Sequence, residues 1–368
     1  MTGVQTCALP IYQALYPNLW REDAAYATTQ HLTNERQIAE SVTSAYFMAN
    51  TRIHQLSILA GLRAEKTETD AEGPLQTGTT FVGRLNRRGA YTDVFPGLHF
   101  RYTPVPSFVT RLSYSSGIGR PSFDSLIPLD SVNDAQQTIT TRNAALKPQY
   151  ADNFDATAEY YFEPVGTVSV SAFSKELHDF IFSDSSQLVG SGANNGYDGQ
   201  YEGYRLTTSR NGGKARYRGI EFAYQQQFTF LPGFWRGFGF YANYTRLTTR
   251  GDYGGTTVTT QVAGFVPKTG NVALTYLGYG FNLRLNAVWR DTYLVTNSTN
   301  PALLVYQEPK LQLNLKTKYT VSPKLSFFCD IENLNKSPIT ETYVGTKDRP
   351  NQTRIVVAKI VAGIQGRF

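Results

Sequence analysis

Apolar and polar side chains alternate through most of this sequence, and this period of two constrains the fold more than any other feature. In segment 281–290, FNLRLNAVWR, the odd positions carry Phe, Leu, Leu, Ala and Trp, whereas the even positions carry mostly Asn and Arg. Segments 311–319 and 325–332 follow the same pattern. Because successive side chains of a β-strand point to opposite faces, each segment predicts a strand with one apolar and one polar face.

The alternation recurs in about thirteen segments between residues 41 and 368, many of them close to the ten residues of a membrane-crossing strand. The connections predicted between these strands are alternately short and long. The short ones, several of which contain the Pro or Gly of tight turns, are 50–52, 103–107, 163–166, 230–235, 277–280 and 321–323. The long polar ones are 66–90, 117–150, 183–213, 250–266, 292–307 and 335–353. This rhythm predicts an all-β fold, an antiparallel up-and-down transmembrane β-barrel.

Composition favours this fold and argues against several functions. Charged residues make up only 17% of the chain, against about 25% in ordinary globular proteins. The net charge of +6 comes from scattered Lys and Arg, so no nucleic-acid partner is expected. The His residues show no metal-ligand spacing, and neither a nucleophile motif nor a phosphate-binding loop occurs. We therefore expect no enzyme activity, metal or cofactor.

The N-terminal residues do not fit the pattern. Residues 1–11, MTGVQTCALPI, read like the translation of a sequencing-library adapter, and they lack the basic start and long apolar run of a secretory signal. We expect residues 1–11 to be such an artefact and residues 12–40 to be an extracellular loop or irregular segment. Residues 41–368 are then the barrel region, the C-terminal part of a longer protein.

A soluble β-sandwich binding module is an alternative, because its strands also alternate with one face in water. Its strands are usually shorter, and its loops lack the strict alternation of short and long. Inside a lipid bilayer every backbone N–H and C=O group needs a partner, and apart from helices only a closed sheet supplies them all.

Several short motifs resemble the C-terminal barrel of TonB-dependent outer-membrane receptors, and they occur in the expected order over 40–368. The motifs are DVFPGL at 93–98, RLSYS at 111–115, GRPSF at 119–123, NAALKP at 143–148 followed by NF at 153–154, GKARYRGIE at 213–221, FYANYT at 240–245, VPK at 266–268 and DIENL at 330–334. Each motif is weak alone, but the ordered set is specific.

This resemblance implies a function in the bacterial cell outer membrane. TonB-dependent receptors take up large, scarce solutes such as siderophores, cobalamin or glycans, with energy from a TonB-type coupling protein. They have barrels of about 22 strands and an N-terminal plug. We therefore expect this chain to form a partial, open barrel without the plug, in contact with outer-membrane lipid and inserted by the barrel-insertion machinery. A passive outer-membrane porin is the alternative, and it predicts no plug upstream.

The polar strand face supplies the candidate site residues. The candidates to line the barrel lumen are Arg63, Arg111, Glu159, Glu221, Arg284, Asn286, Lys316, Asp330 and Glu332. The alternating end of the chain, Ile364, Gly366 and Phe368, is similar to the family's C-terminal insertion signal. We expect solute recognition in the long loops, where the aromatic candidates are Phe123, Tyr197, Tyr201, Tyr204, Tyr253 and Tyr343.

Overall fold

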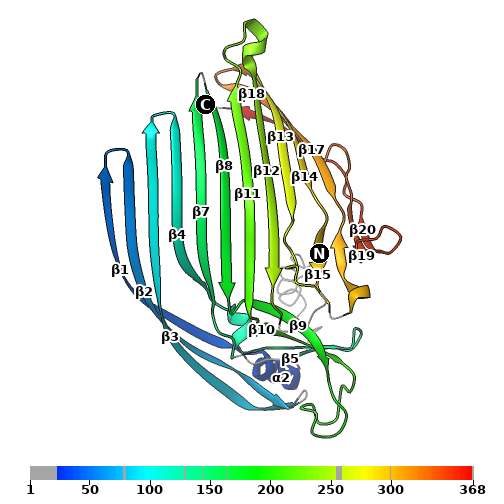
Figure 1. The fold of residues 1–368 in the computed structure, drawn as a ribbon. Coiled ribbons are helices and arrows are strands. Elements are labelled where there is room, and N and C mark those ends of the chain that lie inside the picture. The colour runs from blue at the N-terminus through cyan, green and yellow to red at the C-terminus, as the bar shows by residue number, and fades with distance from the viewer. Residues whose placement is uncertain are drawn as a thin grey trace.

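The computed structural model describes residues 23–366, apart from 78–79, 128–129, 144, 164, 254–258 and 299. Its main feature is one antiparallel sheet of thirteen strands, in which sequence order is also spatial order (Figure 1). The strands are β1 (Gln37–Ile53), β2 (Leu56–Thr77), β3 (Thr80–Val105), β4 (Phe108–Gly119), β7 (Gln149–Phe162), β8 (Gly166–His178), β11 (Lys214–Gln227), β12 (Phe238–Gly251), β13 (Lys268–Gly278), β14 (Phe281–Arg290), β17 (Lys310–Ser322), β18 (Leu325–Glu332) and β21 (Lys359–Gly366). The predicted all-β, up-and-down fold with about thirteen strands is confirmed, and the β-sandwich is wrong.

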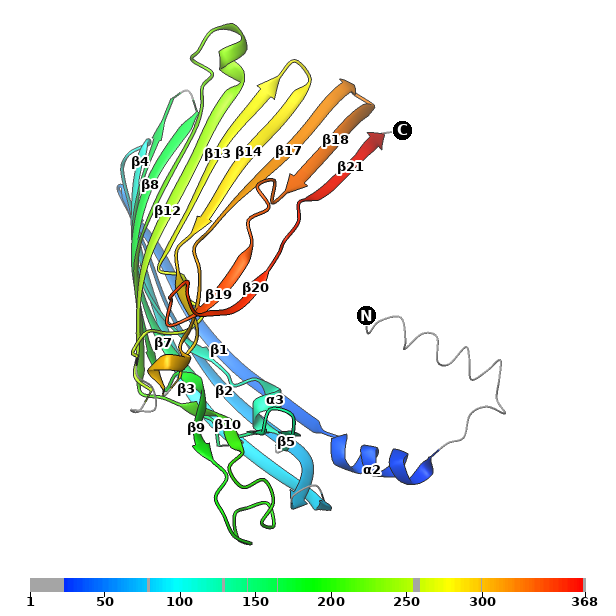
Figure 2. The ribbon, with the colours of Figure 1, turned by 90° about the vertical axis from the view of Figure 1, so that its right-hand side faces the viewer.

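The sheet bends into an open trough instead of a closed barrel (Figure 2). Within the described residues, the strand order ends at β1 and β21, and these two strands do not pair with each other. The prediction of an open, partial barrel is therefore confirmed. Among the same residues, no helix is long and apolar enough to cross a membrane.

The short connections gather at one rim and the long ones at the opposite rim (Figure 1), as the alternating lengths predicted. Between β13 and β14, Tyr279 and Gly280 both have positive φ, of 52° and 82°. Two successive positive φ values are typical of the type I′ turn, whose twist matches that of the flanking strands. This tight turn places β13 and β14 in register from Gly278 and Phe281 onward.

The predicted loop 66–90 is wrong, because β2 and β3 continue through it as one long hairpin, paired residue by residue. Beyond the membrane both faces of a hairpin meet water, so the apolar alternation ends although the strands do not. Polar contacts across the hairpin take its place: Asp70 accepts hydrogen bonds from the Asn86 amide at 2.7 Å and from the Arg88 guanidinium at 2.9 Å.

The other long connections contain two further sheets, which the sequence did not predict. The first sheet is β5 (Asp130–Asn133), β6 (Thr138–Thr141), β10 (Arg205–Asn211) and β9 (Ile181–Leu188); the second is β15 (Tyr293–Thr296), β16 (Val305–Gln307), β19 (Ile339–Tyr343) and β20 (Pro350–Arg354). Most of these strands have only three to five residues. Such short runs show no period of two, and each sheet joins segments from different connections, so local sequence gives little signal.

The segment expected to be irregular, 12–40, contains an α-helix, α2 (Ala24–Asn34), and the start of β1 at Gln37. Asp23 caps the helix by accepting a hydrogen bond from the Tyr26 amide at 2.9 Å, which satisfies one of the free N–H groups of the first turn. Residues 24–34 are therefore helical rather than irregular, and that 12–40 is an extracellular loop stays a prediction. The suspected artefact, 1–11, lies outside the described residues and stays a prediction.

The two faces of the sheet differ in chemistry, and the strand registers show it directly. One register row contains only large apolar residues, one from each of six neighbouring strands: Phe240, Leu274, Leu285, Leu315, Ile331 and Ile360. On β13 the exposed fractions of Val272, Ala273 and Leu274 are 47%, 0% and 45%. The apolar side chains therefore point outward into the surroundings, whereas the face carrying Ala273 is crowded by its own neighbours.

Candidate functional site

The loop after β4 identifies which face of the sheet is concave. The short helix α3 (Phe123–Leu126) lies on the concave side (Figure 2). Three residues before it, Arg120 donates hydrogen bonds from Nη2 to Glu65 Oε2 at 2.7 Å and to Thr67 Oγ1 at 3.0 Å. The odd-numbered side chains of β2 therefore face the concave side, and the registers extend this assignment to the other strands.

A continuous polar row crosses the concave face, with one residue from each of ten neighbouring strands. The row is Ser57, Arg101, Arg111, Thr157, Ser171, Glu221, Thr245, Thr269, Arg290 and Lys310. All nine lumen candidates lie on this face: seven are in the row or an even number of residues from it on their strands, and Asp330 and Glu332 share the face of Lys316 on the next strand, β18. That they line a closed lumen stays a prediction, because the sheet is open.

The concave-face candidates form several separate contacts instead of one cluster. Arg111 forms an ion pair with Glu159, whose other carboxylate oxygen accepts a hydrogen bond from the Tyr161 hydroxyl at 2.5 Å. The Arg284 guanidinium lies 5.9 Å from the centre of the Tyr241 ring. These pairs are distributed along the wall, which suits a wetted surface better than a catalytic site.

Four other lumen candidates differ in the number of contacts that their side chains make. Lys316 and Asp330 stand directly opposite each other in the register of β17 and β18. Asn286 carries a buried side-chain oxygen without a hydrogen-bond partner among the described residues. Arg63 donates from Nε to Glu65 at 2.5 Å and from Nη2 to Ser44 at 2.9 Å.

The proposed C-terminal insertion signal is described only in part. Ile364 is 67% exposed on the convex face, opposite Phe327 of β18, and Gly366 ends β21. Phe368 lies outside the described residues. The role of these three residues in membrane insertion stays a prediction.

Toward the long loops, the chemistry of the two faces reverses on β8, β11 and β12. The concave face of β8 changes from Ser169 and Ser171 to Phe173 and Leu177, interrupted by Lys175. The convex faces of β11 and β12 change in the opposite sense, from apolar side chains to arginines. This reversal is visible in the sequence. Unbroken alternation stops at the residue where the reversal begins, so alternation alone predicts the end of the strand there.

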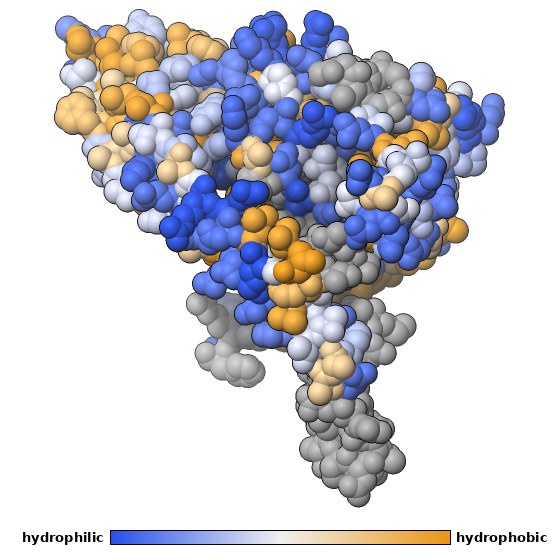
Figure 3. All heavy atoms as spheres, turned by 90° about the horizontal axis from the view of Figure 1, so that it is seen from below, coloured by the Kyte–Doolittle hydropathy of each residue, from blue (hydrophilic) through white to orange (hydrophobic). Residues whose placement is uncertain are grey.

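The reversal builds a pocket of about 810 Å³ on the concave side, near the rim with the long connections. Its wall consists of the concave faces of β8, β11 and β12, completed by β9, by the end of β15 and by the segment after β12. The aromatic lining residues are Phe173, Phe180, Phe182, Tyr217, Tyr253 and Phe265. Among the described residues that line the pocket, Lys175 is the only charged one, and it forms no ion pair within the described part of the chain. Seen from this end, most of the molecular surface is hydrophilic, with hydrophobic residues in separate patches (Figure 3).

Ring contacts hold the pocket wall together. Tyr253 packs edge-to-face against Phe180 and Phe182, at centroid distances of 5.4 and 5.1 Å. The ring centroids of Tyr217 and Phe265 lie 4.7 Å apart. Burial raises the pKa of the Tyr253 phenol, so it stays protonated and donates a hydrogen bond to the Gln261 carbonyl at 3.2 Å.

Of the aromatic loop candidates, Tyr253 is in this pocket and three others are in the core of the first small sheet. Tyr197 is buried there with Ile139, and Tyr201 and Tyr204 pack against them. Burial and the nearby Asp130 raise the pKa of Tyr197. These three tyrosines therefore stabilise the loop fold, and sequence composition alone does not separate such residues from solute contacts.

Asparagines of the long connections hold neighbouring connections together near the ends of β7 and β8. Asn211 donates to the carbonyls of Lys147 and Asp179, at 2.9 and 2.8 Å, and accepts from the Lys147 amide at 2.8 Å. Asn143, in the motif NAALKP, donates to the Ser209 carbonyl at 2.9 Å. The motif thus joins the connection before β7 to β10. In the described residues no group of three or more His, Cys, Asp or Glu could hold a metal ion.

Comparison with known proteins identifies the architecture. The family model described as "TonB dependent receptor-like, beta-barrel" matches residues 5–334. No curated protein sequence matches this chain significantly. Solved structures with a similar fold include the copper transporter OprC, with a TM-score of 0.67 and 13% identity over 90% of this chain and 48% of OprC.

Two further similar structures are receptors from named bacteria. The ferric-catecholate import receptor Fiu from E. coli K12 has a TM-score of 0.64 at 12% identity, over 90% of this chain and 45% of Fiu. The siderophore receptor PiuA from Acinetobacter baumannii has a TM-score of 0.63 at 15% identity, over 90% of this chain and 44% of PiuA. This chain thus spans about half the length of the structures that it resembles, and at such identities the likeness shows the fold alone.

Proposed function

The chain belongs to the TonB-dependent receptor β-barrel family, whose members are bacterial outer-membrane transport receptors, and from this premise we propose that it forms barrel wall of a receptor for TonB-dependent solute uptake. The receptor takes up a large, scarce solute, with energy from a TonB-type coupling protein. The polar concave face hydrates the transport path, and the nine lumen candidates line it. This assignment is for a transport protein rather than an enzyme.

The observation that carries the proposal is the aromatic pocket at the loop rim. It opens on the concave side, where a solute arriving from outside the cell meets the barrel wall first. A volume of about 810 Å³ is in the range of sites for sizeable small molecules. Aromatic walls favour flat apolar groups, and Lys175 favours a negative charge. The solute we propose is therefore an anionic compound with aromatic or flat apolar groups.

Known receptors of similar fold are compatible with such a solute. Fiu imports a ferric catecholate, PiuA is a siderophore receptor, and another structure of similar fold is the ferric citrate transporter FecA. These names support a metal chelate as the solute class. Catecholate chelates combine aromatic rings with negative charge, which suits the pocket better than ferric citrate. A glycan or cobalamin would not place an anionic group against Lys175 in the same way.

Solute binding by the receptor that carries this chain tests the proposal. Tyr217→Ala and Lys175→Gln should each weaken binding of a ferric catecholate about tenfold or more, because each removes a main anchoring contact. The matched control is Lys324→Gln, in the turn between β17 and β18 at the opposite rim, which should leave affinity unchanged. Unchanged affinity in both pocket variants would remove the pocket from the mechanism.

Energy dependence separates active uptake from a passive porin. In cells without the coupling protein, accumulation of the solute should fall to background while surface binding persists. Uptake that continues at the same rate without the coupling protein would contradict the proposed function and favour the porin.

A further inference from the structure

Six basic side chains lie together on the convex face, just beyond the apolar belt of the sheet. On β12 the convex face passes from Tyr244 to Arg246 within two residues, and on β11 from Ile220 to Arg218. We define the outer basic patch as the convex-face residues Lys214, Arg216, Arg218, Arg246, Arg250 and Lys268. The patch lies on three neighbouring strands, β11, β12 and β13, on the side toward the long loops.

Carboxylates neutralise only part of the patch. Glu176 receives a hydrogen-bonded ion pair from Arg216 at 2.8 Å and lies 3.6 Å from Arg218, and Asp291 pairs with Lys268 at 2.9 Å. Arg246 and Arg250 form no ion pair with any described carboxylate. Positive charge therefore remains in excess at this position.

The strand register increases the electrostatic repulsion between the basic side chains of the patch. Arg216 stands directly opposite Arg250, and like charges in directly opposed strand positions destabilise a sheet. A bound anion between the two guanidinium groups would remove this repulsion, because phosphate oxygens accept hydrogen bonds from arginine in a bidentate fashion.

The same rim carries a different arrangement on the β2–β3 hairpin, which serves as an internal comparison. There Lys66 pairs with Glu68 at 2.8 Å, Arg88 pairs with Asp70 at 2.9 Å, and Arg84 pairs with Glu72. Each of these cations has its own carboxylate. On the convex face, the excess of positive charge is therefore found on β11 and β12 and not on the β2–β3 hairpin.

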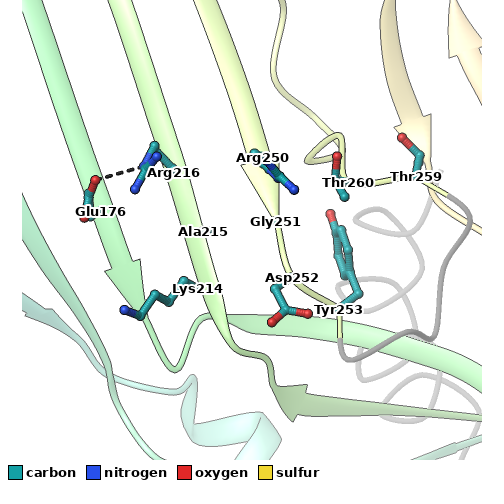
Figure 4. A pocket seen from close by; sticks show the side chains of 10 residues that line it. All are labelled: Glu176, Lys214, Ala215, Arg216, Arg250, Gly251, Asp252, Tyr253, Thr259 and Thr260. Carbon is teal, nitrogen blue, oxygen red and sulfur yellow. Dashed lines mark ion pairs between the residues drawn. The ribbon is translucent and has the colours of Figure 1, made fainter.

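A groove of about 490 Å³ opens at the patch (Figure 4). Lys214, Arg216 and Arg250 line it together with Glu176 and Asp252, and the segment after β12 adds the hydroxyl-bearing residues Thr259 and Thr260. Figure 4 shows Glu176, Arg216 and Arg250 side by side on β8, β11 and β12. The groove is large enough for a phosphate with an attached sugar, and it offers several donors to them.

The height of the patch above the apolar belt indicates which kind of lipid headgroup reaches it. Arg246 and Arg250 lie two and six residues beyond Tyr244, which is about 7 and 20 Å along the strand. With the usual strand tilt of about 40°, Arg250 is about 15 Å above Tyr244. The headgroup layer of an ordinary phospholipid is only about 5–8 Å thick, so a larger headgroup is needed to reach both arginines.

We propose that the outer basic patch binds an anionic glycolipid of the outer leaflet whose saccharide headgroup carries more than one phosphate. Its acyl chains contact the apolar belt around Phe222 and Tyr244, and its phosphates bind the arginines above. The patch lies on the opposite face of the sheet from Phe173, Lys175 and Tyr217 of the pocket, and Tyr253 is the one described residue that borders both the groove and the pocket. The outcome of the lipid-binding experiment therefore does not decide the uptake proposal.

Lipid binding by the purified receptor tests the proposal. In an uncharged detergent, bisphosphorylated lipid A should raise the thermal unfolding midpoint, and monophosphorylated lipid A should raise it less. The double variant Arg216→Gln/Arg250→Gln should bind bisphosphorylated lipid A at least about tenfold more weakly. The control Arg84→Gln/Arg88→Gln, at the same rim, should bind it like the unchanged receptor.

Further control experiments identify the source of the bound phosphate and distinguish a loss of binding from a loss of folding. Arg216→Lys/Arg250→Lys keeps the charges and should retain a substantial part of the binding, which a variant that merely misfolds would not do. Inorganic phosphate or phosphatidylglycerol that stabilised the receptor as strongly as lipid A would overturn the proposal. Equal lipid A affinity of the patch variant and the hairpin control would overturn it as well.

Discussion

Replacing Leu285 with arginine should destabilise the barrel by about 2–4 kcal/mol, the cost of an arginine on the lipid face near the bilayer midplane. Leu285 is the fifth of the ten residues of β14 and is 44% exposed on the convex face. Its register neighbours, Leu274 and Leu315, are also apolar. A guanidinium at this position has no polar side chain within its own register row and would lie in hydrocarbon.

The next residue along the strand provides the matched control. Asn286 lies on the concave face, opposite Ala273 and Asn314. An arginine there reaches the polar side of the wall, so Asn286→Arg should cost much less than Leu285→Arg, because the penalty for a charge on the lipid face does not apply. The two variants introduce the same side chain one residue apart and differ only in the face that receives it.

The assay is unfolding by guanidinium chloride of the receptor that carries this chain, after the receptor has been folded into phospholipid vesicles. The free energy of unfolding follows from the transition midpoint and the denaturant slope, which should not differ between the variants. Equal destabilisation by Leu285→Arg and Asn286→Arg would show that the convex face is not the lipid face, and it would refute the assignment of both faces.

Two further predictions concern a turn and a loop sheet. Gly280→Ala should cost about 1–2 kcal/mol in the same unfolding assay, because Gly280 has a φ of +82° and a Cβ would lie 2.9 Å from the Thr320 carbonyl oxygen. Near Asp184, burial opposes ionisation, but hydrogen bonds from Ser186 and Arg210 outweigh it and lower the pKa of the carboxyl. The β9–β10 pair should therefore be fully stabilised above about pH 4 and lose this contribution as the pH falls through the lowered pKa. Hydrogen exchange in β9 should show the loss, and Asp184→Asn should abolish the pH dependence.

The sequence predicted those parts of the fold that the bilayer dictates. Alternation located the strands because lipid and water impose opposite chemistry on successive residues, as in Phe281–Arg290. It also placed Arg284 and Lys316 on one face and Leu285 on the other, as the registers have them. The turn at Tyr279 and Gly280 was recognisable because glycine accepts the positive φ that the turn requires.

The loop rim was not predictable in the same way. The strands of the small sheets pair segments that are distant in sequence, such as β6 with β10, and runs of four residues have no usable period. The pocket was missed because the faces of β8 and β11 exchange polarity where the strands leave the membrane. Phe173 and Tyr217 therefore looked like breaks in the pattern, although they continue the strands.

The face assignment is tested most directly by spin labels placed one at a time on each residue of β14 in the receptor, reconstituted in lipid bilayers. Collisions with oxygen report exposure to hydrocarbon, and collisions with a water-soluble nickel chelate report exposure to water. Labels at Leu283 and Leu285 should favour oxygen, and labels at Arg284 and Asn286 should favour nickel. Equal accessibility along the strand, or nickel favoured at the leucines, would contradict a wall with lipid on its convex side and water on its concave side.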